Sequence, residues 1–306
     1  MEALVTGGAG FIGSNLVDEL LSIGWDVAVI DNEASEANEQ FYWNENSKNY
    51  RYDITDYRGI NSIFKNHRFD YVFHLAAESR IQSAIDNPVR CTEVNVTGTC
   101  NVLQCSRKHN VKRVMYSSTS SAYGLTDVSP QTENLEVDCL NPYSVTKVAG
   151  ESLCKMYYDL FDLETIIFRY FNVYGHRQPT KGAYAPVVGL FLKQFRDGIP
   201  MTIVGDGEQR RDYTTVHDVV QANIKAALVD NKQALGNIFN IGAGVNYSVL
   251  DIANLIGGNH TFIPARQGEA LSTLANNTKA KDILGWSPVG NLQTYIKEQL
   301  NDNSKA

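Results

Sequence analysis

Tyr143 and Lys147, four residues apart, are well suited to proton transfer. Asn141 and Pro142 precede them and favour the N-cap and first position of a helix, which would place both side chains on one helix face. A tyrosine acts as a base near neutral pH only if its pKa falls by about three from about 10, which corresponds to roughly 4 kcal/mol. A nearby ammonium group favours that change, so the pair predicts a general base and its electrostatic partner. An exposed aromatic–lysine pair is the alternative.

A run of hydroxyl side chains, residues 116–124, precedes this pair and includes Ser117, Thr119 and Ser120. At the carboxyl end of a strand, such hydroxyls point into a ligand crevice, where one can relay a proton from a substrate to Tyr143. A loop whose hydroxyls bond only its own backbone is the alternative. The sequence has no G-x-S-x-G elbow, which argues against a serine hydrolase.

Three glycines near the N-terminus, Gly7, Gly10 and Gly13, are spaced as in a dinucleotide-binding loop. Glycine permits a tight turn and close approach of a pyrophosphate, which the following helix N-terminus attracts. A loop that merely needs glycine is the alternative. Asp31 ends the second predicted strand, where a carboxylate binds ribose hydroxyls and repels a 2′-phosphate. No arginine follows it in residues 32–34, so NAD is predicted rather than NADP.

Short β-branched runs alternate with segments of helical period over the first two thirds of the chain. The predicted strands are Ala3–Thr6, Asp26–Ile30, Asp70–Leu75, Arg113–Ser117 and Glu164–Phe168. The predicted helices are Gly10–Ile23, Tyr57–Asn66, Asn95–His109 and Pro142–Phe161. This alternation indicates βαβ units around a parallel sheet, that is, an α/β fold.

Glycine and proline become denser after about Arg169, which indicates a second, smaller domain. We predict a cofactor-binding domain at residues 1–170, to which residues 214–240 return. Residues 171–213 and 241–306 are predicted to form the substrate-binding domain.

Composition narrows the class of protein. The chain has 306 residues, 43% of them hydrophobic, and a net charge of −7. These values argue against disorder and against general nucleic-acid binding. No apolar run is long enough to span a membrane, and no signal peptide is recognised. Five cysteines without a C-x-x-C pair predict neither a zinc site nor a disulfide framework, and fit the cytoplasm.

The motifs together resemble the extended short-chain dehydrogenase/reductase family. Those that carry the resemblance are the glycine loop, Asp31, the hydroxyl run, Tyr143 with Lys147, His74–Ala77, Asn95–Thr99, Arg169–Gly175, Gly205–Tyr213 and Arg266–Glu269. They are most similar to the UDP-glucose 4-epimerase subgroup and its UDP-N-acetylglucosamine relatives. The resemblance implies a Rossmann doubly wound parallel sheet with a smaller, interleaved C-terminal α/β substrate domain.

The resemblance also implies which residues bind NAD. They are Gly7, Gly10, Phe11, Ile12, Gly13, Asp31, Asn32, Asp53, Ile54, Leu75, Ala76, Ala77, Asn95, Ser117, Tyr143 and Lys147. Asp31 and Asn32 would hold the adenosine ribose, and Asp53 with Ile54 the adenine. The positive nicotinamide ring would join Lys147 in lowering the pKa of Tyr143.

The catalytic residues that the resemblance implies are Thr119, Tyr143 and Lys147. Residues implied in UDP-sugar binding are Thr119, Ser120, Tyr143, Asn172, Arg211, Arg266, Glu269 and Thr273. Thr273 lies seven residues after Arg266, where a small side chain in the family is typical of enzymes that admit N-acetylhexosamines. That Thr273 is simply a polar residue at a strand end is the alternative.

One loop separates related activities. The dTDP-glucose 4,6-dehydratases carry Thr-Asp-Glu where this chain has Thr119-Ser120-Ser121, and elimination of water needs those carboxylates. The segment 74–79 is dehydratase-like, so a dehydratase or decarboxylase stays an alternative, as does a non-catalytic NAD-binding sensor. We predict an NAD-dependent C-4 epimerase of UDP-glucose and UDP-galactose that also accepts UDP-N-acetylglucosamine and UDP-N-acetylgalactosamine. The resemblance further implies a homodimer joined through helices near residues 95–109 and 142–161.

Overall fold

A seven-stranded parallel sheet forms the larger part of the molecule. The computed structural model describes residues 1–35, 38, 40–180, 185–265 and 270–302. The strands, in spatial order, are β10 (Asn237–Ile241), β6 (Glu164–Tyr170), β5 (Arg113–Thr119), β4 (Tyr71–His74), β1 (Glu2–Thr6), β2 (Asp26–Asp31) and β3 (Lys48–Arg51). Every neighbouring pair is parallel. The predicted Rossmann α/β fold is confirmed.

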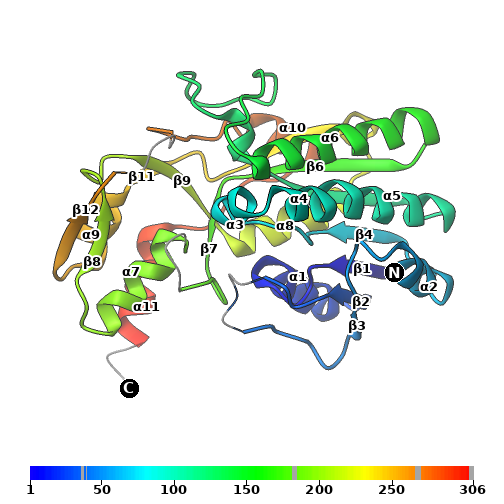
Figure 1. Cartoon of the computed structure of the whole chain (residues 1–306), viewed down its shortest axis with the longest axis horizontal. Helices are drawn as coiled ribbons and strands as arrows, with labels where there is room; N and C mark the ends of the chain where they lie inside the picture. Colours follow the sequence, from blue (N-terminus) through cyan, green and yellow to red (C-terminus); the bar gives the residue numbers. More distant parts are fainter. Residues whose placement is uncertain (36–37, 39, 181–184, 266–269, 303–306) are drawn as a thin grey trace.

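Helices cover both faces of this sheet (Figure 1). Helices α1 (Phe11–Ser22) and α8 (Val216–Leu228) pack on one face together with α10 (Thr278–Leu284). Helices α2 (Tyr57–Lys65), α5 (Thr99–Lys108) and α6 (Pro142–Phe161) pack on the other. Successive strand residues alternate between the two cores, as a pleated strand requires: Val5 and Leu4 of β1 lie in opposite clusters.

One predicted helix differs from the structure. The helix expected at 95–109 begins at Pro88, because the side chain of Asn87 accepts a hydrogen bond from the backbone N–H of Arg90 (3.1 Å). It runs as α4 (Pro88–Thr92), a π-helical turn η1 (Glu93–Gly98) and α5. The π-helical turn contains Asn95, one of the predicted site residues.

The remaining elements form a smaller part, at the left of Figure 1. Its strands are β7 (Asn172–Tyr174), β8 (Met201–Val204), β9 (Arg210–Thr215), β11 (Asn246–Ser248) and β12 (His260–Ile263). Its helices are α7 (Val187–Arg196), α9 (Val249–Ile256) and α11 (Leu292–Asp302), which share a hydrophobic cluster with β8. Short elements α3 (Ile81–Asp86), η2 (Ser120–Tyr123) and η3 (Lys232–Ala234) complete the described chain. The predicted domain boundaries stay a prediction.

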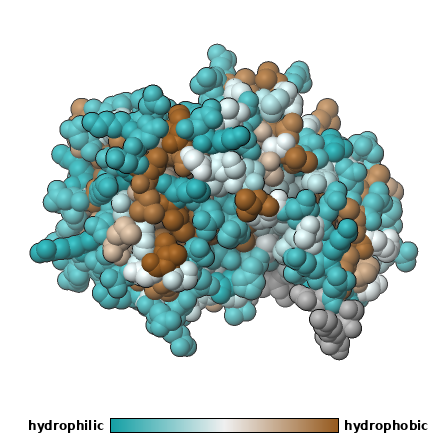
Figure 2. Space-filling model, turned by 180° about the vertical axis from the view of Figure 1, so that it is seen from behind, coloured by the Kyte–Doolittle hydropathy of each residue, from teal (hydrophilic) through white to brown (hydrophobic). Residues whose placement is uncertain are grey.

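The surface is mostly hydrophilic on the face shown in Figure 2, where hydrophobic residues form narrow bands. None of the helices in the described ranges has the length and apolar character needed to cross a membrane. No cluster of metal-ligating side chains is present among the described residues either.

Candidate active site

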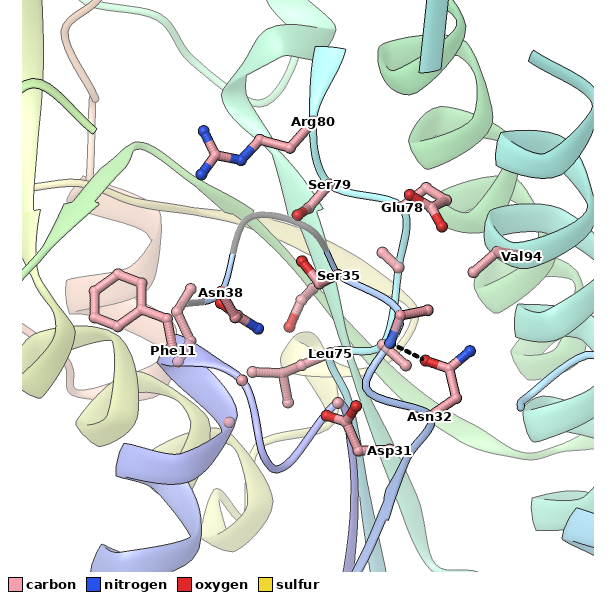
Figure 3. Close-up of a pocket in the computed structure, with 18 of the residues that line it drawn as sticks. Phe11, Asp31, Asn32, Ser35, Asn38, Leu75, Glu78, Ser79, Arg80 and Val94 are labelled. Carbon is pink, nitrogen blue, oxygen red and sulfur yellow. Dashed lines mark hydrogen bonds between the residues drawn. The ribbon is translucent and has the colours of Figure 1, made fainter. Parts of the chain in front are cut away.

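A cavity of about 350 Å³ opens at the carboxyl ends of β1, β2, β4 and β5. In the close-up of Figure 3, Asp31 and Leu75 lie at its floor, Phe11 at one side, and Ser79 and Arg80 across its upper end. All the predicted cofactor residues except Asn95 line it. Asn95 is buried behind the wall, where its side chain bonds both backbone groups of Glu78 and the hydroxyl of Thr146.

The glycine loop forms a cradle that excludes side chains. Gly7 has a φ of +70°, and a Cβ there would lie 2.7 Å from the backbone nitrogen of Ala76. A Cβ on Gly13 would overlap the carbonyl oxygen of Gly7. At Gly10, a Cβ would meet nothing closer than 3.4 Å. The backbone is therefore bare where α1 begins, which fits the close approach of a dinucleotide pyrophosphate.

The adenosine end of the cavity has a fixed set of acceptors. Asp31 accepts hydrogen bonds from the backbone N–H groups of Ala9 (3.1 Å) and Glu33 (2.8 Å), and burial raises its pKa against these bonds. Asp53 accepts bonds from Asn32 (3.0 Å), Arg90 and Thr55. Burial opposes ionisation of Asp53, but the bonds from Thr55 and Arg90 lower its pKa to about 2. These hydrogen bonds fix the orientation of both carboxylates at this end of the cavity.

Tyr143 and Lys147 line this cavity, whereas the predicted catalytic residue Thr119 lies outside its lining. Asn141 caps α6 with its side chain on the backbone N–H of Ser144 (3.0 Å), so the helix begins as predicted and places Tyr143 in its first turn. Thr119 ends β5 and shares a side-chain hydrogen bond with Tyr143. Lys147 is buried, and its ammonium donates to the carbonyl oxygen of Ser117 (2.6 Å).

The electrostatics of the pair differ from the sequence-based expectation. Burial raises the pKa of Tyr143, although the hydrogen bond with Thr119 opposes this. Burial also lowers the pKa of Lys147 to about 8. The ammonium of Lys147 faces a backbone carbonyl, so in the protein alone it does not bring the pKa of Tyr143 below its ordinary value. For Tyr143 to act as a base, bound NAD in its oxidised form would have to supply the positive charge that lowers this pKa.

A second cavity, of about 700 Å³, adjoins the first. Ser120, Asn172, Arg211 and Thr273 line it, as the resemblance implied, and Tyr143 lines both cavities. One guanidinium nitrogen of Arg211 donates to the carbonyl oxygens of Arg210 (2.9 Å) and Ala270 (2.8 Å). The predicted residues Arg266 and Glu269 lie outside the described residues.

The charge of the second cavity favours an anionic ligand. Arg80 and Arg211 line it, and none of its described lining residues is an aspartate or a glutamate. Ser120 and Ser121 line this cavity, Thr119 does not, and the loop therefore presents no carboxylate to it. A diphosphate is compatible with a cavity lined by arginines. Elimination of water needs a carboxylic acid as general acid, and the described lining supplies none.

Sequence reasoning missed three residues of these walls. Arg80 lines both cavities, and Arg90 binds Asp53. Neither arginine belongs to a recognisable motif after the strand that ends at His74. Tyr213 lay within a quoted motif, but no role was predicted for it. Tyr213 lines the second cavity, and its buried hydroxyl has no hydrogen-bond partner in the described part of the chain.

Comparisons with known proteins agree with this geometry. Residues 3–242 match the model of the NAD dependent epimerase/dehydratase family. The UDP-glucose 4-epimerase of Mycolicibacterium smegmatis is 36% identical over 94% of both chains. The structure of Thermotoga maritima UDP-glucose 4-epimerase with UDP-glucose superposes with a TM-score of 0.93 at 35% identity, over 100% of this chain and 99% of that one.

A third similar structure is UDP-N-acetylglucosamine 4-epimerase from Methanobrevibacter ruminantium in complex with UDP-N-acetylmuramic acid. Its TM-score is 0.90 at 28% identity, over 100% of this chain and 99% of that one. The resemblance inferred from the motifs and the prediction of NAD as cofactor are confirmed. The chain is an enzyme, and it belongs to the NAD dependent epimerase/dehydratase family.

Proposed function

We propose that this chain catalyses the NAD-dependent C-4 epimerisation of a UDP-hexose through a 4-keto intermediate. The observation that carries the proposal is the place of Tyr143, which lines the cofactor cavity and the carboxylate-free cavity beside it. Proton transfer at Tyr143 can therefore be coupled to a sugar in one cavity and a nicotinamide in the other. The names of the similar enzymes, UDP-glucose 4-epimerases, support this assignment.

Each catalytic side chain has a distinct task in this reaction. Tyr143 takes the proton from the 4-hydroxyl of the sugar and later returns it. Thr119, which shares a hydrogen bond with Tyr143, holds the phenol toward the sugar. The Lys147 ammonium stabilises the phenolate and is itself oriented by the Ser117 carbonyl. When bound, NAD would supply the acceptor for a hydride from C-4 and the donor that returns it after the 4-keto sugar has turned its other face toward the cofactor. Because the cofactor is regenerated, no external oxidant is required.

The test is incubation of the purified protein with UDP- and dTDP-sugars without added cofactor. We expect interconversion of a UDP-hexose with its C-4 epimer. Release of water from the sugar would instead identify a dehydratase, and loss of carbon dioxide a decarboxylase. Failure to turn over any member of the panel, with NAD bound, would favour the non-catalytic sensor. UDP-glucuronate belongs in the panel because two arginines line the second cavity.

We further propose that N-acetylated sugars are accepted, because Thr273 is a small side chain in the wall of the second cavity. Its hydroxyl accepts a hydrogen bond from the backbone N–H of Asp212 (3.4 Å), and its backbone N–H donates to Arg210 (3.1 Å). Its neighbour Leu271 is 84% exposed, and neither Leu271 nor Leu274 lines the cavity. These observations support the prediction that Thr273, and not Leu271 or Leu274, lies beside the sugar.

Replacing Thr273 by tyrosine tests this second proposal. The larger ring is expected to lower kcat/KM for UDP-N-acetylglucosamine by more than for UDP-glucose, because a packed wall deforms little. Thr273→Val is the matched control: it removes the hydroxyl bond to Asp212 while keeping the size of the side chain. An unchanged ratio of the two kcat/KM values in Thr273→Tyr, or rejection of the acetylated sugar by the parent, would contradict the proposal.

The homodimer is also a proposal, supported by the exposed side chains of α6. Val145, Met156 and Leu160 are 51%, 36% and 66% exposed, and their spacing places them on one helix face. An apolar stripe of this kind suits a helix that packs against a second copy. Light scattering after size-exclusion chromatography measures the mass in solution, and a monomer would contradict the proposal. The cytoplasmic location stays a prediction.

A further inference from the structure

A buried ion pair lies directly behind the catalytic residues. Glu151 is on α6, one turn after Lys147, and Arg169 is on β6. The two residues are only 4% and 2% exposed, and their side chains bond through two contacts: Nε to Oε1 at 2.9 Å and Nη2 to Oε2 at 2.7 Å. Removing two charges from water opposes folding, and the attraction between them has to offset that cost. A buried ion pair therefore contributes little net stability, so its place beside a catalytic group indicates a role other than stabilising the fold.

The pair is connected to the catalytic strand end. The hydroxyl of Ser118 donates to Oε1 of Glu151 (2.5 Å), while the preceding residue, Ser117, accepts the Lys147 ammonium at its carbonyl oxygen. Lys147 and Glu151, one turn apart on α6, therefore bind Ser117 and Ser118, two consecutive residues of β5. Thr119, which bonds Tyr143, is the next residue of that strand. The geometry makes Glu151 part of the frame that fixes β5 relative to α6.

Three acidic groups act on Lys147, and Glu151 is the carboxyl group among them. Burial lowers the pKa of Lys147 to about 8, while Cys154 of α6, Cys91 of α4 and Glu151 would each oppose this when ionised. Burial raises the pKa of both thiols, so they are neutral at pH 8. Among the groups on the other packed elements, His74 of β4 is neutral because burial lowers its pKa to about 3. Tyr116 of β5 presents its ring 4.9 Å from the ammonium, and burial raises its pKa.

We propose that Glu151 is a positioning residue for the epimerisation: it docks the end of β5 on α6 through Ser118 and keeps Lys147 in its ammonium form. The inference rests on the proposed function for its consequence in catalysis, but the state of Lys147 can be measured without any substrate. Arg169 binds both carboxylate oxygens of Glu151. Its third guanidinium nitrogen has no hydrogen-bond partner within the described chain, and its guanidinium lies 4.7 Å from the ring of Tyr123.

The direct test is a pH titration of Lys147 by NMR of protein with isotope-labelled lysine, the signal being assigned by its absence in Lys147→Arg. Glu151→Gln keeps the shape of the side chain and removes its charge. We expect the titration midpoint of Lys147 to fall by about one pH unit in this variant. Ser118→Ala, the matched control, removes the hydroxyl bond but keeps the charge, and should leave the midpoint within about 0.2 pH unit. An unchanged midpoint in Glu151→Gln overturns the proposal.

A double variant, Glu151→Gln with Arg169→Met, removes both charges. It decides the question if the single variant does not fold, since an unpaired buried arginine is strongly destabilising. It should shift the midpoint in the same direction; a shift only in the single variant would assign the effect to the unbalanced Arg169 and overturn the proposal.

In turnover assays with the epimerised sugar, the alkaline limb of kcat should move down with the midpoint. Loss of stability alone, with both pH profiles unmoved, would mean a purely structural pair. If no sugar is epimerised, the proposed function fails while the NMR titration still decides the role of Glu151.

Discussion

The two cavities are built in different ways: the first, which we call the cofactor cavity, contains the glycine loop, and the second, proposed to bind the sugar nucleotide, is called the substrate cavity. Adjacent parallel strands bring Gly7, Asp31, Ala76 and Ser117 to one edge of the sheet, so the cofactor cavity is formed from repeated βα units. The substrate cavity combines α6, β7, α7, β9 and the segment around Thr273, which come from distant parts of the sequence. A scaffold can thus keep its cofactor chemistry while loops of the other half change the substrate.

Tyr143 belongs to both cavities, so its removal is expected to have the largest effect. Tyr143→Phe removes the proton transfer, which contributes about 10²- to 10⁴-fold to the rate, while affinity for the UDP-sugar changes by only a few fold. Thr119→Val should reduce kcat less, because Tyr143 can still reach the hydroxyl through a water molecule. Measurement of kcat and of sugar binding by calorimetry separates the two effects. Near-normal turnover of Tyr143→Phe would exclude the phenol as the base.

Arg211 tests the substrate half alone. Arg211→Met should raise KM for the UDP-sugar by about 10- to 100-fold, the range expected for a lost charge-assisted hydrogen bond, and leave NAD content unchanged. Arg210→Met is the matched control, because the Arg210 side chain bonds Asn246 and Asp251 instead of lining the cavity. Equal effects of the two variants on KM would show that Arg211 acts only through the local fold.

Two glycines test the cofactor half. Gly10→Ala adds a methyl group in ordinary van der Waals contact with Asn38 and the Gly7 carbonyl (3.4 Å), so we expect unchanged stability of the NAD-free protein and NAD binding weakened by about tenfold. Gly13→Ala forces the loop apart at the Gly7 carbonyl and should lower both NAD binding and the free energy of unfolding. Calorimetry of NAD binding and chemical denaturation distinguish them. Full NAD affinity in Gly10→Ala would place the pyrophosphate elsewhere.

Much of the fold follows from local signals in the sequence. The observed bounds of α6 equal the predicted ones because Asn141 and Pro142 mark the helix start. Strand β3 was missed because Lys48–Arg51 is a short, polar edge strand without an apolar run. The start of the helix at Pro88 was missed although Asn87 and Pro88 form a recognisable cap. Local chemistry therefore predicts elements well where they are capped or fully buried.

The residues of the candidate site likewise fall into two groups: those that a local motif predicts and those that only the tertiary structure reveals. Residues fixed by a motif, such as Gly13 and Asp31, could be assigned from the sequence. Arg80 and Arg90 could not, because only the three-dimensional packing brings them to the cavity. The raised pKa of Tyr143 was equally inaccessible, since burial and the direction of the Lys147 ammonium depend on tertiary structure.

The smallest expected effect concerns the adenosine end of the cofactor cavity, where Asp53 holds Asn32, Thr55 and Arg90. Its pKa is about 2 in the folded protein and about 3.9 in an unfolded chain, so its contribution to stability is complete above about pH 4. That contribution is lost as the pH falls toward 2. Asp53→Asn has no charge to lose, so its free energy of unfolding should vary less with pH over this window than that of the parent.

The matched control for this prediction is Asp86→Asn, because Asp86 is exposed and bonds only Gln82 among the described residues. It should keep the acid dependence of the parent. Chemical denaturation at a series of pH values between about 2 and 5 measures the difference. If Asp53→Asn follows the parent curve, the contacts of Asp53 do not hold the adenosine end in place, and the cofactor cavity would be less prearranged than its hydrogen bonds indicate.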